Sequence, residues 1–212
     1  MFINLNTHSY YSLLMSSITI DDIINFAIKN KQKYVSLIDI NSMYGTIEFY
    51  HKAINNNLIP VIGLQIEYQN EKVILVAKNN NGCKNLFKIS SLVMTDRELD
   101  LPQHLSDLFV IVNDTSKCSW IKDHESSFSL NQNANDCIAC REAFFESKDD
   151  IEYIKVLHAI KDGVTYKDVG DLSEFSDNYM LNEEQASKLY SEKSLENLSK
   201  LLEIYDEIID GL

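Results

Sequence analysis

The sequence predicts an α/β fold with a mostly parallel sheet or barrel. Short apolar runs, typical of buried strands, alternate with segments of helical periodicity through the first 146 residues. The 212 residues are enough to bury one sizeable core, or one domain and a small appendage. A hydrophobic content of 45% with 11 tyrosines indicates a folded globular chain and excludes a disordered one.

Seven apolar runs are interpreted as strands. They cover residues 2–5, 34–38, 60–68, 72–78, 109–112, 128–130 and 137–139. The connection between the third and fourth runs is short enough to predict a hairpin.

Helical spacing of apolar residues is clear in residues 20–29, where Thr19 or Asp21 can cap the first turn. Gly163 is expected to end a later helix, since glycine accepts the left-handed conformation found after helices. The other expected helices cover residues 43–55, 82–94, 147–161 and 194–209, with one more opening at residues 182–185 and a helical turn at residues 117–122.

The net charge of −13 excludes several classes of function. An acidic chain without a Lys/Arg cluster is a poor binder of duplex DNA, whose affinity depends on cationic contacts to phosphate. The opening residues lack the basic and apolar regions of a signal peptide. No apolar run approaches the ~20 residues of a membrane span. We therefore expect a cytoplasmic protein that contacts neither a membrane nor duplex DNA directly.

The cysteines fit the same compartment. Cys137 and Cys140 form an isolated pair, and no second Cys or His pair at suitable spacing could complete a zinc site. Together with Cys83 and Cys118 they are expected to be reduced thiols.

The opening segment carries the first candidate site. Asn4, Asn6 and His8 alternate with apolar Ile3 and Leu5. Since side chains alternate across a strand, the three polar groups should share one face. Such a face predicts a site that lines a barrel or a cleft.

Residues 2–14 resemble the first motif of the PHP (polymerase and histidinol phosphatase) family, in which two of the three motif histidines are replaced here by asparagine. Residues 37–50 and 58–68 resemble its second and third motifs, with Asp39 at the motif aspartate. Residues 82–91 and 138–145 are also similar to family segments. The resemblance covers residues 2–208 and is weak in residues 95–135. It is closest to the form at the amino terminus of bacterial replicative polymerases, the alpha subunits of DNA polymerase III.

This resemblance implies a distorted seven-stranded (β/α) barrel, incomplete or distorted between residues 95 and 135, with a helical extension. Residues 1–148 would form the PHP-like barrel. Residues 149–212 would form a C-terminal helical segment leading toward a following polymerase domain. The implied partners are that polymerase domain and a proofreading or other replisome subunit. Mg²⁺ would be the cofactor of the complete polymerase, while none is expected for this domain.

PHP sites hold two or three divalent cations through histidine and carboxylate ligands, which activate water and bind a phosphate ester. Here Ile40 and Phe144 stand at ligand places and cannot bind metal, while amides offer only a neutral oxygen. We therefore expect a vestigial cluster with no catalytic residue and no bound transition metal. Its ligand-capable members are His8, Asp39 and Glu142, and the former ligand places are Asn4, Asn6, Gln65, Ile40 and Phe144. At a strand end, Asp39 is expected to accept hydrogen bonds instead.

Three functions stay open. The first is a non-catalytic scaffold or protein-interaction part of a replicative polymerase, active in DNA replication as part of a nucleotidyltransferase. The second is an active metal-dependent phosphoesterase or 3′–5′ exonuclease of the PHP family. The third is a free-standing interaction protein. Counting ligands favours the first. The apolar side chains of residues 189–209 should either fold back on the barrel or mediate self-association.

Overall fold

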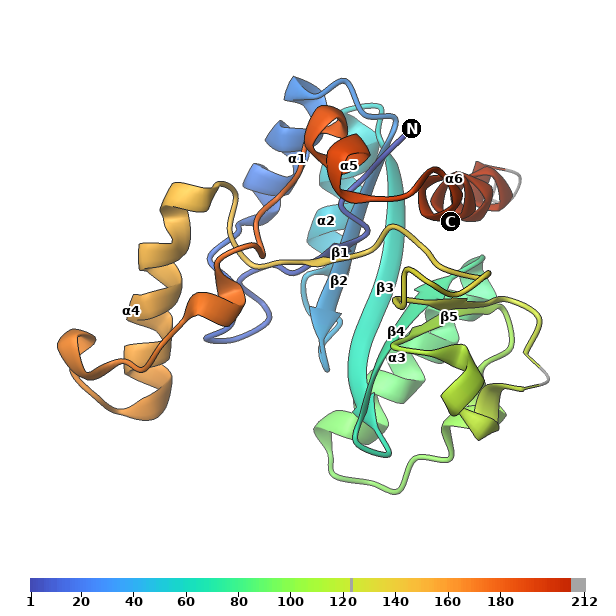
Figure 1. Cartoon of the computed structure of the whole chain (residues 1–212). Coiled ribbons are helices and arrows are strands. Elements are labelled where there is room, and N and C mark those ends of the chain that lie inside the picture. Colours follow the sequence, from blue (N-terminus) through green and yellow to red (C-terminus); the bar gives the residue numbers. More distant parts are fainter. Residues whose placement is uncertain (123, 207–212) are drawn as a thin grey trace.

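The computed structural model describes residues 1–122 and 124–206, and in this part of the chain it confirms a mixed α/β fold (Figure 1). Five strands form the larger sheet in the order β2-β3-β4-β5-β6. They are β2 (Tyr34–Ile40), β3 (Ile59–Tyr68), β4 (Glu71–Ala77), β5 (Leu108–Val112) and β6 (Ser127–Ser129). The outer pairs, β2 with β3 and β5 with β6, are parallel, while β4 is antiparallel to both neighbours. The predicted hairpin between β3 and β4 is therefore confirmed.

A second, two-stranded sheet pairs β1 (Asn6–Thr7) with β7 (Glu142–Ala143) in parallel. No ladder joins it to β2 among the described residues, although Ser36 Oγ of β2 donates a hydrogen bond of 2.6 Å to Leu5 O. The opening of the chain thus lies beside β2. The described strands form an open sheet and a separate pair.

Helices cover one face of the larger sheet. They are α1 (Ile20–Lys29), α2 (Thr46–Asn55) and α3 (Asn80–Met94), whose apolar side chains share a core with alternate strand residues such as Leu64 and Leu75. Thr19 caps α1 in a capping box with Asp22, as one of the two predicted caps. Gly82 of α3 lies against the loop before β5, where an added Cβ would fall 2.2 Å from Asp107 O.

The opposite face of the sheet carries the second core. It contains the opening residues, residues 138–140 and side chains from two late helices, α5 (Glu183–Leu189) and α6 (Glu192–Asp206). Figure 1 shows α6 on the other side of the sheet from α1. Leu198, Leu201 and Leu202 of α6 are fully buried there. The tail helix therefore folds back on the sheet, one of the two predicted outcomes.

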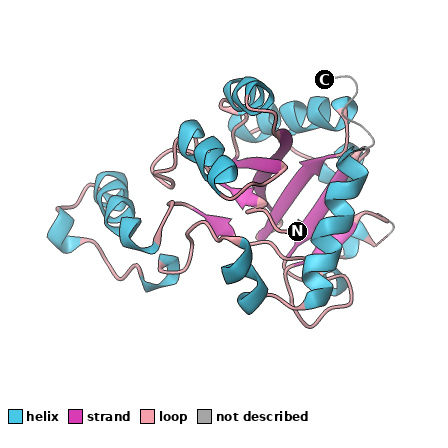
Figure 2. Cartoon of the chain, turned by 90° about the horizontal axis from the view of Figure 1, so that it is seen from above, coloured by secondary structure: helices cyan, strands magenta, loops and turns pink. Residues whose placement is uncertain are grey.

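The remaining helix, α4 (Ile151–Asp162), lies away from the sheet (Figures 1 and 2). It packs through Ile154 onto Phe144 and Phe145 in a small third cluster. Gly163 ends α4 with a φ of +66°, as expected from its position. Short 3₁₀ turns occur at Leu101–His104, Thr115–Lys117, Ser119–Ile121, Lys148–Asp150, Tyr166–Asp168 and Ser173–Phe175.

Two of the strand predictions are wrong. Residues 2–5 join no ladder, because the Asn4 side chain instead exchanges hydrogen bonds with the backbone of Leu181. Residues 137–139 make only an isolated bridge between Cys137 and Ser129, since the backbone of Ala139 turns to bond Ser194 O. The short strand β7 was not predicted.

Some helix boundaries also differ from prediction. The helix expected at residues 43–55 begins only at Thr46. The chain turns before it at Asn41, whose φ is +59°. The turn expected at residues 117–122 is two 3₁₀ turns. The helix expected at residues 147–161 starts as a 3₁₀ turn. Residues 207–209 of the last predicted helix lie outside the described residues.

Candidate functional site

The candidate site lies where β1 and β7 meet the ends of β2 and β3. His8 directly follows β1, Asp39 lies near the end of β2, Gln65 lies in β3 and Glu142 lies in β7. The parallel register of β1 with β7 places Asn6 opposite Glu142. Segments separated by more than 100 residues are thus brought together at one place.

Asp39 anchors the loop that follows His8. Its carboxylate accepts hydrogen bonds from Ser9 N at 2.6 Å, Ser9 Oγ at 2.8 Å and Ser12 Oγ at 2.7 Å. Ser12 Oγ in turn accepts from Ile40 N at 3.0 Å. Burial raises the pKa of Asp39 above its ordinary value, although the serine donors act in the opposite direction. These donors occupy both carboxylate oxygens, so the role of Asp39 in this structure is to hold the loop.

A chain of hydrogen bonds links the other polar residues. Asn6 Nδ2 donates to Gln65 Oε1 at 2.7 Å, and Gln65 Nε2 donates to Glu142 Oε1 at 2.7 Å. Lys72 Nζ of β4 contacts the second carboxylate oxygen, Glu142 Oε2, at 2.6 Å. The chain therefore joins β1, β3, β4 and β7.

The charges around Glu142 determine its protonation. Burial alone would raise its pKa, but the imidazole of His8 and the ammonium of Lys72 outweigh burial and lower the pKa to about 2. The His8 contribution acts over a distance of 3.8 Å, which is too long for a hydrogen bond, so we assign the main effect to Lys72 at 2.6 Å. Glu142 is therefore a carboxylate at neutral pH.

His8 is fully buried, and its ring stacks on Phe144 with centroids 4.6 Å apart and planes 16° from parallel. Neither ring nitrogen of His8 has a hydrogen-bond partner within the described residues, and neither does Asn6 Oδ1. Ile40 packs against the same cluster as Phe144. Phe144, which stands at an expected ligand place, thus covers one face of the imidazole.

Asn4 does not belong to this network. Its side chain donates to Leu181 O at 2.9 Å and accepts from Leu181 N at 2.8 Å. It connects the opening segment to Leu181, two residues before α5, so its part in this structure is structural.

The residues present do not fit a multinuclear metal centre. Among residues 1–122 and 124–206 no group of three or more His, Cys, Asp or Glu side chains is placed to hold a metal ion. Gln65 turns its NH₂ group toward Glu142 Oε1, so a hydrogen bond already occupies this carboxylate oxygen. Lys72 already supplies a positive charge to Glu142.

Lys72 is the residue that the sequence reasoning missed. It belongs to none of the recognised motifs, and it lies near the start of β4, close to the turn of the β3–β4 hairpin. The hairpin register could have suggested that Lys72 lies near Gln65, since the two are close in the β3–β4 ladder. The sequence contains no signal for the distant β7.

The four cysteines are all buried and unpaired in the part of the chain that the structure describes. Burial raises the pKa of the Cys83 thiol to about 11 and that of Cys140 to about 12. Such thiols are protonated at neutral pH and therefore poor nucleophiles and metal ligands.

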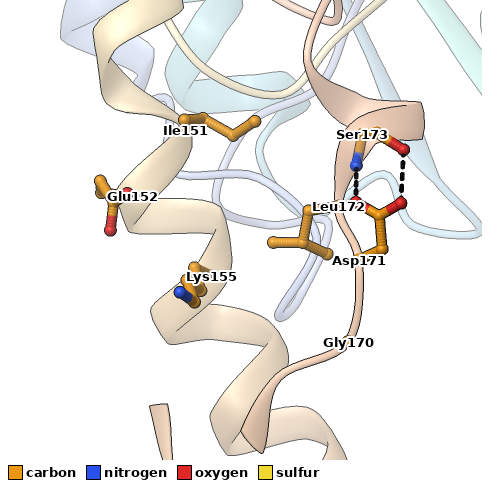
Figure 3. A pocket seen from close by; sticks show the side chains of 7 residues that line it. All are labelled: Ile151, Glu152, Lys155, Gly170, Asp171, Leu172 and Ser173. Carbon is orange, nitrogen blue, oxygen red and sulfur yellow. Dashed lines mark hydrogen bonds between the residues drawn. The ribbon is translucent and has the colours of Figure 1, made fainter. Parts of the chain in front are cut away.

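Several cavities lie outside this network, two of them beside α4 and beside the loops after β1 and β2. One, of about 300 Å³, lies between α4 and the segment around Gly170 (Figure 3). Leu172 points toward the helix there, while Asp171 bonds Ser173 through both carboxylate oxygens. The other, of about 560 Å³, is mainly apolar and is lined by residues of the loops after β1 and β2, among them Tyr10, Leu13 and Tyr44. Neither holds a convergent set of catalytic side chains.

The sequence profile of the PHP domain matches residues 4–145, which include β1, β7 and every strand between them. The chain belongs to the PHP domain family. It is 42% identical over 204 residues to the DNA polymerase III subunit alpha of Ureaplasma parvum, a match that covers 95% of this chain and 21% of that protein. The subunit alpha of Mycoplasma genitalium is 30% identical over 95% of this chain and 26% of its own length.

A third relative, the subunit alpha of Staphylococcus epidermidis, is 27% identical over 96% of this chain and 21% of its own length. This PHP chain is thus homologous to a PHP region within DNA polymerase III alpha subunits, and it spans about a quarter or less of their length. Within the part of the chain that the structure describes, no helix has the length and apolar character that a membrane span requires.

Proposed function

We propose that this chain serves as the PHP part of a bacterial replicative DNA polymerase and acts there as a non-catalytic scaffold. The relatives named above support the polymerase context, since each match covers 95% or more of this chain. The polymerase activity itself, a nucleotidyl transfer that uses Mg²⁺, would reside in other parts of such a subunit. A replicative role also implies a cytoplasmic location.

One observation carries the non-catalytic assignment. Lys72 Nζ binds Glu142 at 2.6 Å, at the place where a PHP enzyme needs a carboxylate free to bind a cation. The stacking of Phe144 on His8 acts in the same direction, because a phenyl ring replaces a ligand. Two of the expected ligand places are therefore apolar or neutralised.

We also propose that the described strands correspond to a distorted, open form of the seven-stranded PHP barrel, continued by a C-terminal helical segment from about residue 149. Three contacts support this. Ser36 bonds Leu5 beside β1, Lys72 reaches across to β7, and Ser129 at the end of β6 bridges Cys137. In this proposal the strands follow one another around a common interior, with breaks in the ladders.

The surface that meets a partner is proposed to be the outer face of α4. Tyr153, Val156 and Ile160 are 60%, 45% and 61% exposed, and their spacing of three and four residues puts them on one side of the helix. The remainder of the polymerase chain is the proposed partner, with a proofreading or other replisome subunit as a second one. The charge of −13 makes a protein partner more suitable than DNA.

A second function has one observation in its favour. The two ring nitrogens of His8 and Asn6 Oδ1 are buried without partners close to Glu142, and such atoms could bind a cation. A metal-dependent phosphoesterase or 3′–5′ exonuclease therefore stays the alternative.

Turnover by the purified chain separates the two functions. We expect no hydrolysis of p-nitrophenyl phosphate or of 3′-labelled single-stranded DNA above background with Mn²⁺, Zn²⁺ or Mg²⁺. His8→Ala is the matched variant and should equal the wild-type protein in this assay. A rate that disappears with a chelator and with His8→Ala would establish the enzyme instead.

The scaffold role is tested in a chimera. This chain would replace the matching region of the Ureaplasma parvum subunit, and primer extension would be measured. We expect an active chimera that loses activity or solubility with Tyr153→Glu and Ile160→Glu combined. Glu152→Gln, on an exposed part of the same helix, is the control and should have no effect. An unchanged chimera with both α4 substitutions would refute this contact surface.

A further inference from the structure

Lys72 occupies an unusual position for a strand lysine. It lies in β4, directly across the hairpin from Glu67, yet its ammonium group binds Glu142 of β7 at 2.6 Å. The Lys72 side chain is 36% exposed and that of Glu142 only 18%. The contact therefore connects β4, the central strand of the five-stranded sheet, to the separate two-stranded sheet.

Few other charges are available to Glu142. Gln65 from β3 and Asn6 from β1 are neutral, and the nearest imidazole nitrogen, His8 Nε2, is 3.8 Å away. The neighbouring Arg141 directs its guanidinium elsewhere, where it donates to Tyr179 O and lies over the Tyr179 ring. Among these neighbours, Lys72 is thus the one that brings a full positive charge into direct contact with the Glu142 carboxylate.

A largely buried carboxylate needs such a charge. Removing one partner of a buried pair leaves the other charge uncompensated, and this is more costly than removing both. A divalent cation would meet the same requirement in a metal-binding member of the family. In this chain the requirement is met by a side chain that also spans from β4 to β7.

We infer that the Lys72 ammonium replaces the metal cation of the family as the permanent counter-ion of Glu142 and thereby ties the β1–β7 pair to the five-stranded sheet. At the place of the family's metal site, the ion pair of Lys72 and Glu142 then has a purely structural role. The inference rests on the non-catalytic site of the proposed function, but the two fail separately. Turnover by the wild-type chain would refute the proposed function, whereas the stability of Lys72 variants tests the inference.

The test is a set of thermal unfolding measurements on the full 212-residue chain. Lys72→Met keeps most of the side-chain volume but removes the charge, and we expect it to lower the Tm by about 5 °C. The double variant Lys72→Met with Glu142→Gln should recover much of this loss, because no unpaired charge is left. Lys72→Arg should stay within about 2 °C of wild type. Lys29→Met, at an exposed lysine of α1, is the matched control and should change nothing.

A second measurement asks whether an external cation can take the place of the ammonium. We expect millimolar Mn²⁺ to raise the Tm of Lys72→Met, since its Glu142, His8 and Asn6 Oδ1 are then free to bind it. Wild type and the double variant should not respond. If Lys72→Met does not fold, a double variant that folds supports the inference. If the double variant also fails to fold while Glu142→Gln alone folds, the inference is overturned.

Other results would also overturn it. These are a Lys72→Met variant as stable as wild type, a double variant no more stable than Lys72→Met, an absence of any Mn²⁺ effect on Lys72→Met, and equal stabilisation of wild type by Mn²⁺.

Discussion

Glu142 shows how a single residue can keep its place in a motif while its surroundings change its role. In this structure its two oxygens accept hydrogen bonds from Gln65 and Lys72. The sequence indicates that Glu142 is a ligand-capable residue, but its chemical type does not specify its partners. Its actual partner comes from a strand 70 residues earlier.

The acid stability of the protein should depend on Glu142. Because its pKa is about 2 in the folded state against 4.5 ordinarily, ionised Glu142 stabilises the fold above about pH 4.5. That contribution, at most about 3 kcal/mol, is lost as the pH falls from 4.5 to 2. Urea unfolding of wild type and Glu142→Gln between pH 2 and 7 should therefore converge at low pH. Exposed Glu98→Gln is the control, and parallel curves for wild type and Glu142→Gln would contradict the assignment.

Asp39 should be important for the stability of the protein. Asp39→Asn replaces one accepting oxygen by an NH₂ group, so the three donors from Ser9 and Ser12 cannot all be satisfied. We expect a loss of about 2–4 kcal/mol in the free energy of unfolding, measured by urea denaturation. Asp162→Asn, at an exposed position on α4, should change it by less than about 0.5 kcal/mol. A similar small change for Asp39→Asn would show that the loop does not depend on this anchor.

Among the elements, α6 joins the last described part of the chain to its opening residues. Its leucines at positions 198, 201 and 202 form one buried side, and they meet the opening residues Phe2, Ile3 and Leu5. The sequence predicted the helix and its excess of apolar side chains. It could not specify the opposite face of the sheet as the place that buries them, because many apolar faces satisfy the same pattern.

Truncation of Leu201 should therefore destabilise the whole protein. Leu201→Ala leaves a cavity at a fully buried site, which usually costs about 2–5 kcal/mol. The matched control is Leu189→Ala in α5, where the side chain is 53% exposed. This substitution should change the free energy of unfolding by less than about 0.5 kcal/mol. Both values follow from urea denaturation at neutral pH. Equal effects of the two substitutions would mean that α6 does not pack on the sheet in solution.

For the molecule as a whole, charge is the dominant property. A net charge of −13 opposes the phosphate backbone of DNA, and the proposed role needs no direct contact with it. We expect no binding of a primed duplex at 0.15 M salt and protein concentrations up to about 10 μM, measured by fluorescence anisotropy. Tight binding that weakens steeply with added salt would contradict a protein-contacting role.

The sequence by itself determined the α/β class, the β3–β4 hairpin, a cap at Thr19 or Asp21, the helix end at Gly163 and the membership of the PHP family. Each of these depends on local spacing or on local residue types, which are readable along the chain. The residues at the former ligand places were readable in the same way.

Only the tertiary structure decided which groups meet. The short ladders of β1 and β7 contain two residues each, so their pairing depends on a neighbour more than 130 residues away and leaves no periodic pattern. Lys72 likewise meets Glu142 only because the folded chain brings β4 and β7 together. Contacts of this kind arise from the packing of distant segments, and local physical chemistry does not specify them.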